Sequence, residues 1–142
     1  MDRDTEDRIK TAGLRRTRDR VRTLDHLLAA DRPLAHGDLE TALSRIDRVT
    51  LYRVLEALEA AGLLHRILGA DGVWRYRAHR ETGARCPGGH PHFLCLECGR
   101  MACLTDQPLP RVDVPPGTVV RRKQLVASGL CPACAATPDR ED

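Results

Sequence analysis

The chain has 142 residues, which is enough for one ordinary domain or two small ones. Apolar residues make up 42% of it and aromatic residues only 3%, so its core must consist mainly of Leu, Val and Ala, and such small cores often need bound metal. No stretch is apolar enough to cross a membrane, and the first residues lack a signal-peptide core, so we expect a cytoplasmic protein without a membrane partner.

The net charge of +3 does not by itself indicate a nucleic-acid partner, but the charge is unevenly distributed. The excess of basic residues lies in the first 80 residues, with five arginines from Arg15 to Arg22 against one acid, Asp19. A solvated helix face is the usual explanation of such a run, and a phosphate-binding surface is the alternative. Because the cytoplasm keeps thiols reduced, the six cysteines indicate metal or redox chemistry rather than disulfides.

The first predicted elements are helices. Residues 1–12 are expected to form a short polar helix that Gly13 interrupts. Thr17 is a good N-cap for a helix that runs to about Ala30, because Val and Leu side chains recur on one face of that segment. A further short helix is expected over residues 36–43.

Residues 48–61 are predicted to form another helix, with Asp47 as its N-cap and Gly62 at its end. Its apolar residues follow the spacing i, i+3, i+4 and i+7 and form one buried stripe of Leu51, Val54, Leu55 and Leu58. Tyr52 and Arg53 lie on the opposite face. For Tyr52 alone, a partly buried helix aromatic and a DNA-contacting side chain are equally good interpretations.

Two short strands are predicted next, over residues 63–68 and 73–78, joined by a turn at 69–72. Helices followed by a hairpin are typical of a winged helix-turn-helix domain, in which one helix enters the major groove and the hairpin lies along the DNA backbone. Arginines near the N-terminus and on the second strand would then contact phosphates, while residues of the last helix would face bases. The candidate DNA-contacting residues are Arg15, Arg16, Arg18, Arg48, Tyr52, Arg53, Arg75 and Arg77.

The composition changes beyond the hairpin, and we predict four parts in the chain. They are a winged-helix domain over residues 1–80, a linker rich in Gly, His and Pro over 81–91, a metal-binding domain over 92–136, and a disordered tail over 137–142. Short strands are expected in the second domain over residues 93–96, 101–104 and 118–126. Four prolines between residues 105 and 117 discourage a long helix there. The predicted fold class is therefore α+β, with a small, mostly β second domain.

Two CxxC pairs carry the strongest chemical signal in the sequence. They are Cys95 with Cys98 and Cys131 with Cys134. Each CxxC turn points two thiolates at one centre, and two such turns complete the tetrahedral sulfur site that suits zinc. A site closed by four cysteines has no open position, so we expect it to be structural. The alternative is two separate thiol pairs with redox activity.

The remaining cysteines, Cys86 and Cys103, accompany two histidines, His90 and His92. Together with His65 they offer a second metal site in which imidazole and thiolate ligands favour zinc over manganese or ferrous iron. The alternative interpretation is that these are exposed linker residues with a free thiol.

At this point the sequence resembles the ferric uptake regulator (Fur) family over nearly its whole length. The matching segments are AGLRRTRDRV at 12–21, VTLYRVL at 49–55, EAAGL at 59–63, HPHFLCLECG at 90–99 and GLCPAC at 129–134. The resemblance implies homodimeric bacterial repressors that bind AT-rich palindromic operator DNA when a regulatory metal is bound. It also implies a structural zinc on the two CxxC pairs, a dimerisation role for the second domain, and a recognition helix that carries Thr50, Tyr52 and Arg53.

The regulatory site distinguishes the branches of this family. The iron and peroxide branches usually have a histidine where this chain has Pro33, and the iron branch has another where Lys123 falls. By contrast, His65 and Cys86 resemble ligands of the zinc-uptake (Zur) branch. Where the family commonly has a carboxylate ligand, this chain has Cys103, an exchange that favours zinc. The usual helix between Cys103 and the last strand is missing, which implies a changed dimer interface.

These observations predict a zinc-responsive transcriptional repressor rather than an enzyme. The sequence has no nucleophile–base pair, no Gly-rich phosphate loop and no open metal site with a general base. We expect the regulatory zinc to bridge the wing side and the second domain through four of His65, Cys86, His90, His92 and Cys103. The alternatives are an iron- or manganese-responsive regulator of the same fold, a thiol-based redox or peroxide sensor, and a zinc-stapled DNA-binding protein without a sensor site.

Overall fold

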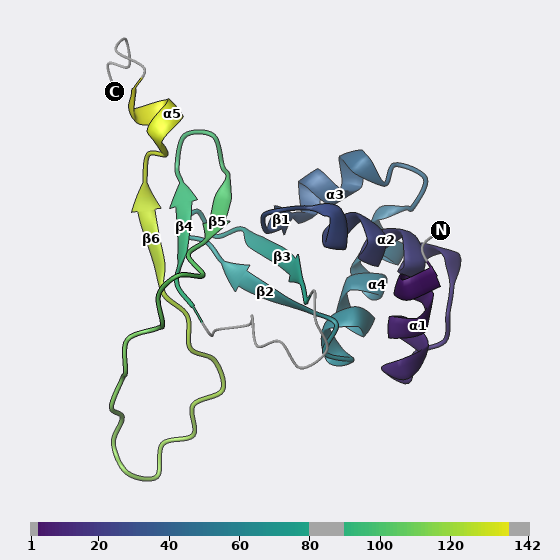
Figure 1. Ribbon diagram of the computed structural model, residues 1–142, viewed down its shortest axis with the longest axis horizontal. Coiled ribbons are helices and arrows are strands. Elements are labelled where there is room, and N and C mark those ends of the chain that lie inside the picture. The colour runs from purple at the N-terminus through teal and green to yellow at the C-terminus, as the bar shows by residue number, and fades with distance from the viewer. Residues whose placement is uncertain (1–2, 80–89, 137–142) are drawn as a thin grey trace.

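The computed structural model describes residues 3–79 and 90–136. The helices of this part are α1 (Arg3–Thr11), α2 (Arg18–Ala29), α3 (His36–Ala42), α4 (Arg48–Ala60) and α5 (Pro132–Ala135). The strands are β1 (Leu34–Ala35), β2 (Leu64–Leu68), β3 (Trp74–Ala78), β4 (His92–Cys95), β5 (Met101–Cys103) and β6 (Val126–Gly129) (Figure 1). None of the described helices is long and apolar enough to cross a membrane.

The N-terminal helices follow the predicted caps. The Thr17 side chain accepts a hydrogen bond from the backbone N–H of Arg20 at 3.3 Å, and Asp47 accepts one from the N–H of Thr50 at 2.8 Å. Each bond satisfies a donor that a helix N-terminus leaves unpaired. Gly62 ends the α4 segment with a φ of 78°, a conformation that glycine adopts without strain. The four predicted helices of this part are confirmed within one or two residues of their expected ends.

The wing is a three-stranded antiparallel sheet with the strand order β1-β3-β2. β2 and β3 form the predicted hairpin, in which Arg66 pairs with Tyr76. β1 has only two residues, and Leu34 of this strand pairs with Tyr76 from the other side. Three helices and this sheet confirm the winged-helix arrangement, whereas β1 is too short to show a period of two in the sequence.

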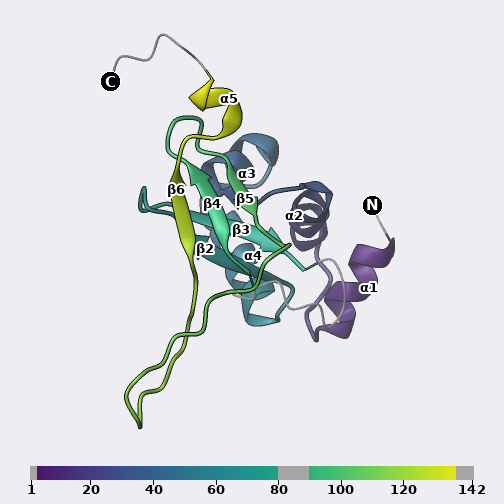
Figure 2. The ribbon, with the colours of Figure 1, turned by 60° about the vertical axis from the view of Figure 1, so that its left-hand side comes forward.

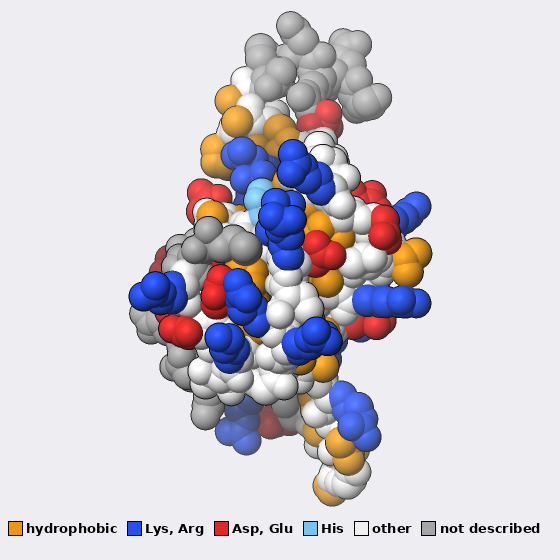
Figure 3. All heavy atoms as spheres, turned by 90° about the vertical axis from the view of Figure 1, so that its right-hand side faces the viewer, with side chains coloured by type: hydrophobic (Ala, Val, Ile, Leu, Met, Phe, Trp, Pro, Cys, Tyr) orange, Lys and Arg blue, Asp and Glu red, His pale blue; other side chains and the backbone are white. Residues whose placement is uncertain are grey.

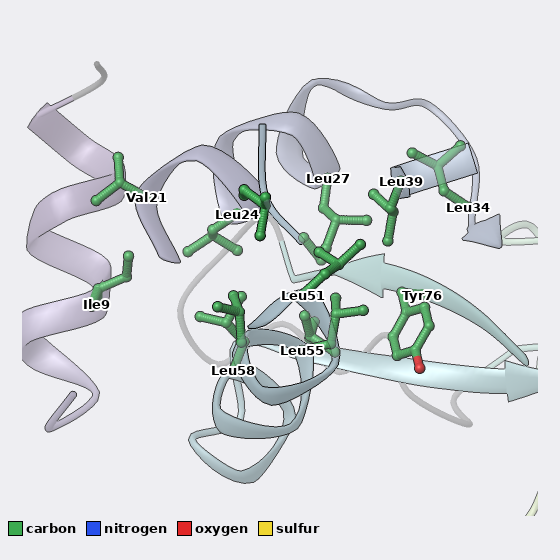
Figure 4. Packing of buried hydrophobic residues seen from close by; sticks show 14 residues of the cluster. Ile9, Val21, Leu24, Leu27, Leu34, Leu39, Leu51, Leu55, Leu58 and Tyr76 are labelled. Carbon is green, nitrogen blue, oxygen red and sulfur yellow. The ribbon is translucent and has the colours of Figure 1, made fainter. Parts of the chain in front are cut away.

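The main core lies between the helices and one face of the wing. The predicted stripe of α4 is buried, and Leu51, Leu55 and Leu58 lie against α2 in the close view of Figure 4. Tyr76 of β3 closes the core on the sheet side, and Ile9 of α1 packs at the opposite end. Burial of aliphatic side chains contributes about 1.5–3 kcal/mol each, so this cluster is the chief source of stability for the first domain.

The second sheet has the order β5-β4-β6, with β4 antiparallel to β5 and parallel to β6. The strand predicted over residues 118–126 is wrong, because the paired segment starts at Val126 and runs to Gly129. Its register explains the difference, since Gly129 lies opposite Cys95 and the chain then reaches Cys131 without a further turn. The two CxxC pairs therefore fix which residues form β6.

The segment from 104 to 125 connects β5 to β6 as a long loop that projects away from both sheets in the two views of Figures 1 and 2. As the four prolines predict, this segment contains no helix. Its valines are exposed to solvent, with Val119 at 74% and Val112 at 63% of their full accessible area.

A second, small core joins the wing to the second sheet. Ile67 of β2, Leu94 of β4 and Met101 of β5 are each at most 1% exposed and pack together, with half-buried Val126 beside them. One face of the wing therefore covers the main core and the other face covers the second sheet. The predicted linker over 81–91 falls almost entirely on residues outside the described part of the chain, so the domain boundary there stays a prediction.

Candidate metal centres and DNA-binding surface

The four cysteines of the CxxC pairs come together at one end of the second sheet. Cys95 ends β4, Cys98 follows in the turn, Cys131 precedes α5, and Cys134 lies within α5. All four sulfur atoms lie within 4.8 Å of one another, and the sulfurs of Cys98 and Cys131 are 3.9 Å apart. Sulfurs bound to one tetrahedral zinc at about 2.3 Å would be about 3.8 Å apart, so the arrangement fits zinc.

Local backbone geometry prepares this site. Gly99, with a φ of 77°, closes the first turn by donating its N–H to the carbonyl of Cys95 at 3.0 Å. The N–H of Cys98 points at the Cys95 sulfur at 3.4 Å, and such backbone N–H groups lower the pKa of Cys95 to about 6. A thiolate is the form that binds metal, so the turn favours the ligand state of Cys95.

A second group of metal-binding side chains lies at the start of β4. Ligand atoms of His90, His92 and Cys103 lie within 4.8 Å of one another. The strand register explains two of them, because His92 of β4 lies directly opposite Cys103 of β5. The Nδ1 of His90 lies 3.1 Å from the carbonyl of Pro91, which can only accept, so His90 donates from Nδ1.

His79, which was not among the expected ligands, pairs with His65 on the wing side, next to but outside this group of three. Its Nε2 lies 3.0 Å from the Nδ1 of His65, and the ring of His65 is 6.4 Å from that of His92 between centroids. Two nitrogens on one tetrahedral zinc would be about 3.3 Å apart, close to the observed His65–His79 separation. The register of the β2–β3 hairpin is what identifies His79. Its N–H bonds to the carbonyl of Leu63, which brings His65 and His79 to one edge of the wing.

Electrostatics favour a neutral imidazole at His65 and at His79. Burial first, and then the neighbouring histidines and Arg77, lower the pKa of His65 to about 3, and burial also lowers the pKa of His79. Within the described residues, both ring nitrogens of His92 and the Nε2 of His65 are buried without a hydrogen-bond partner. Buried polar atoms without partners are costly, and a metal bound to one nitrogen of His92 would remove part of that cost.

A cleft of about 510 Å³ gives access to this cluster. His65, His79 and His92 line one side of it, and residues 121–124 of the β5–β6 loop line another. Lys123, at the position of an iron-branch histidine, belongs to that lining, whereas Pro33 is buried in the first domain. Cys86 lies outside the described residues, so its place in the site stays a prediction.

The candidate DNA-contacting residues lie mostly on the surface of the helices. Figure 3 shows this side of the molecule, with Lys and Arg side chains spread over it and acidic groups between them. Exposed members of the candidate set are Arg15, Arg16, Arg18, Arg48, Tyr52 and Arg53. Thr50 is half-buried, and its hydroxyl donates to Asp47 at 2.9 Å. The helix faces therefore carry the arginine groups that phosphate contact requires.

Tyr52 is partly exposed and packs against a neighbouring ring. It is 45% exposed, and its ring stacks on His36 of α3 with 3.9 Å between ring centroids and 23° between ring planes. His36 lies 3.3 Å from Glu40, which also pairs with Arg48 at 3.1 Å. The stack orients the Tyr52 ring while its outer part stays open to a partner.

The two wing arginines do not have the exposed positions we expected of phosphate contacts. Arg75 is only 4% exposed, and its guanidinium is bound to Asp71 and to the carbonyl of Gly99. Arg77 is half-buried and donates to the carbonyl of Ala30 at 2.6 Å. The reason is that the second sheet and the end of α2 cover the faces of β3 that we assigned to DNA.

The sequence has clear relatives. A sequence model described as the Ferric uptake regulator family matches residues 11–114. The "Transcriptional regulator FurA" of Mycobacterium tuberculosis is 32% identical over 139 residues, an alignment that covers 93% of this chain and 90% of that protein.

Solved structures with the same fold include regulators of iron and of zinc uptake. The Vibrio cholerae ferric uptake regulator superposes with a TM-score of 0.65 at 20% identity, over 90% of this chain and all of that one. A zinc uptake regulator complexed with zinc and DNA superposes with a TM-score of 0.62 at 20% identity, over 93% of this chain and 91% of that one. At such identities these structures establish the shared fold.

Proposed function

The chain belongs to the ferric uptake regulator family of transcriptional regulators, and on this premise we propose that it is a cytoplasmic zinc-responsive repressor that binds operator DNA as a homodimer. Regulators of this family are not enzymes. The finer statement, that zinc is the signal, rests on the residues of this chain rather than on the names of its relatives, which include both iron and zinc regulators.

The observation that carries the proposal is the cluster of ligand-type side chains at the junction of the two sheets. His65 and His79 come from the wing side, and His90, His92 and Cys103 come from the second sheet. These side chains offer nitrogen and sulfur atoms as ligands and no carboxylate oxygen, a combination that favours zinc over manganese or ferrous iron. We therefore add His79 to the expected ligands His65, Cys86, His90, His92 and Cys103.

The four-cysteine centre has a different role in this proposal. Its sulfurs all come from the second domain, in which they tie β6 and α5 to the turn after β4. Zinc there would stabilise the small domain, which among the described residues contributes only Leu94 and Met101 to the small core that it shares with Ile67 of the wing. We assign structural zinc to Cys95, Cys98, Cys131 and Cys134.

The mechanism follows from the place of the regulatory cluster. Zinc supplies a centre to which several neutral imidazoles and a thiolate can bind at once. His65 and His79 would hold the wing to that centre, while His90, His92 and Cys103 would hold the second sheet. Ligation at both sides selects one arrangement of the DNA-binding domain relative to the second domain, and operator affinity rises if DNA needs that same arrangement. In a homodimer this would set the distance between two recognition helices and match it to two half-sites.

The DNA contacts are proposed for the exposed helix residues. Tyr52 and Arg53 on α4 face the bases, and Arg15, Arg16, Arg18 and Arg48 neutralise phosphates. Thr50 orders the start of the recognition helix through its bond to Asp47. Arg75 is left out of this set because it is buried. The half-buried Arg77 supports the DNA-binding domain indirectly, because it ties β3 to the carbonyl of Ala30 at the end of α2.

The test is a zinc titration of operator binding. Protein with one zinc per chain, at the cysteine centre, is titrated under reducing conditions with zinc, manganese or ferrous iron, and fluorescence anisotropy reports binding to an AT-rich palindrome from the promoter of its own gene. We expect zinc alone to raise affinity by about 5–150-fold, the usual range for coupled sites. His79→Ala should lose this gain, while His26→Ala, a histidine on α2 away from the cluster, should keep it.

Other outcomes distinguish the alternatives. A gain mainly with iron or manganese would contradict the choice of zinc. Equal binding with and without the second metal would leave a zinc-stapled DNA-binding protein, and loss of binding on mild oxidation without zinc dependence would indicate a thiol sensor.

A further inference from the structure

Arg75 is the most deeply buried charged residue among those described, and neither metal site uses it. Only 4% of it is exposed, and it lies on β3, the central strand of the wing sheet. An arginine stays ionised at every pH that a protein tolerates, so its burial requires well-placed partners. The partners identify its role.

One partner belongs to the wing turn. The guanidinium forms a two-point ion pair with Asp71, with N···O distances of 2.9 and 3.1 Å. Asp71 in turn accepts from the N–H of Val73 at 3.1 Å, which shapes the turn between β2 and β3. The ion pair lowers the pKa of Asp71, so the pair stays charged at neutral pH.

The other partner belongs to the second domain. The same guanidinium donates to the carbonyl of Gly99 at 3.0 Å, and Gly99 directly follows the zinc-site residue Cys98. The fit around this contact is tight. A Cβ placed on Gly69 of the wing turn would lie 2.7 Å from the Arg75 guanidinium and 2.9 Å from Leu94 of β4.

We propose that Arg75 is a positioning residue that locks the wing turn to the Cys95–Gly99 turn, so that zinc at the four-cysteine centre holds the wing in place. This inference rests on the structural zinc assigned above. The zinc fixes the Cys95–Gly99 turn, the turn presents the Gly99 carbonyl, and Arg75 passes that constraint to Asp71 and the wing. The structural centre thereby contributes to the arrangement that the regulatory zinc selects.

Because coupling is reciprocal, the wing must also stabilise the zinc turn. This gives a readout that does not depend on DNA binding: the rate at which zinc leaves the cysteine centre. Arg75→Met keeps an unbranched, mostly apolar stem but removes the guanidinium, and with it the bonds to Asp71 and to the carbonyl of Gly99. It leaves Asp71, which is about one-third exposed, in contact with water rather than buried as an unpaired charge.

The matched control removes a different contact between the two domains. Gln124, from the β5–β6 loop, binds both the N–H and the carbonyl of Leu68 at the far edge of the wing, at 3.3 and 2.9 Å. Gln124→Ala therefore weakens the contact between domains without touching the zinc turn.

Zinc content is first measured in the full-length proteins, and its release to excess chelator is then followed in a colour assay. We expect Arg75→Met to release zinc at least about fivefold faster than the wild type, the low end of the range for coupled sites, and Gln124→Ala to match the wild type. Amide hydrogen exchange at Gly69, Gly72 and Val73 should rise in Arg75→Met as well.

Each result decides the matter. Equal release from Arg75→Met and wild type, or equal acceleration by Gln124→Ala, overturns the assignment of Arg75. Absence of tightly bound zinc from the wild type would instead refute the structural zinc on which the inference rests. If Arg75→Met does not fold, Arg75→Lys takes its place: it keeps a charge that can reach only one partner, and release as slow as in the wild type would overturn the proposal.

Discussion

Shortening Leu94 to Ala tests whether the chain has two cores that unfold separately. Leu94 is fully buried between β2 and the second sheet, where it packs on Ile67 and Met101. Leu55 occupies a comparable place in the main core, 1% exposed on α4. Leu94→Ala and Leu55→Ala remove the same atoms from two different clusters, so each is the control for the other.

The expected magnitude follows from the surroundings of each leucine. Replacing a buried Leu by Ala removes buried apolar atoms and leaves a cavity, which usually lowers the free energy of unfolding by about 2–5 kcal/mol. The small core is near the surface and can collapse onto the gap, so we expect about 2–3 kcal/mol for Leu94→Ala and about 3–4 kcal/mol for Leu55→Ala. With a urea dependence of about 1 kcal/mol per M for a small domain, Leu94→Ala should lower its midpoint by about 2–3 M.

Two probes separate the cores in a urea titration. Circular dichroism at 222 nm follows the helices, of which α1 to α4 all belong to the winged-helix domain. Fluorescence of Trp74 follows the junction, because that ring lies 4.3 Å from the Arg66 guanidinium and 4.9 Å from that of Arg122. Leu94→Ala should shift mainly the fluorescence transition and Leu55→Ala mainly the circular dichroism transition. Coincident shifts of both signals in both variants would refute the existence of two separate cores.

Three further predictions concern the metal, the DNA and the pH. Cys131→Ser should remove the structural zinc and unfold the second domain, while the helical circular dichroism of the first domain persists; a content of tightly bound zinc equal to that of the wild type, measured by atomic emission, would contradict the four-cysteine assignment. Arg53→Ala should weaken operator binding by about 5–150-fold in anisotropy titrations, as loss of a base contact does, while Arg111→Ala on the projecting loop should not; equal affinities of the two variants would exclude α4 as the recognition helix. Burial lowers the pKa of His36, so the unfolded chain binds a proton more readily and the free energy of unfolding should decrease as the pH falls through about 6.5. His36→Gln should make the decrease in the free energy of unfolding between pH 7.5 and 5.5 smaller. Parallel plots of this free energy against pH for the variant and the wild type would show that His36 stays solvated.

The parts of the fold that the sequence predicts correctly are those that depend on neighbours along the chain. Thr17 and Asp47 mark helix starts because their side chains bind N–H groups three residues ahead. The apolar stripe of α4 follows from helical spacing alone. The CxxC pairs belong to the same class, since a four-residue turn brings both sulfurs of each pair together.

The parts that the sequence analysis missed depend on contacts between distant segments. Residues 118–126 have the β-forming composition of a strand, yet the strand starts at Val126, because the second CxxC pair must reach the first. Arg75 alternates with apolar residues as a solvent-facing strand residue does, but the second sheet covers that face. His79 directly follows the second strand of the predicted hairpin, outside the expected ligand set, and only the hairpin register places it beside His65.

In our proposal, this difference between local and distant contacts also separates the two metal centres by function. The cysteine centre takes its ligands from one domain, so metal binding there changes the stability of that domain more than its position. The histidine cluster takes ligands from both sides of the junction, and a metal can favour one arrangement of two bodies only if it binds both. Arg75 qualifies this division, because its bond to Gly99 gives the structural centre a contact across the same junction. Arg75 and the histidine cluster then both hold the wing to the second domain. The regulatory zinc has to supply only the remaining difference in free energy between the two arrangements of the domains, which for coupled sites is about 1–3 kcal/mol.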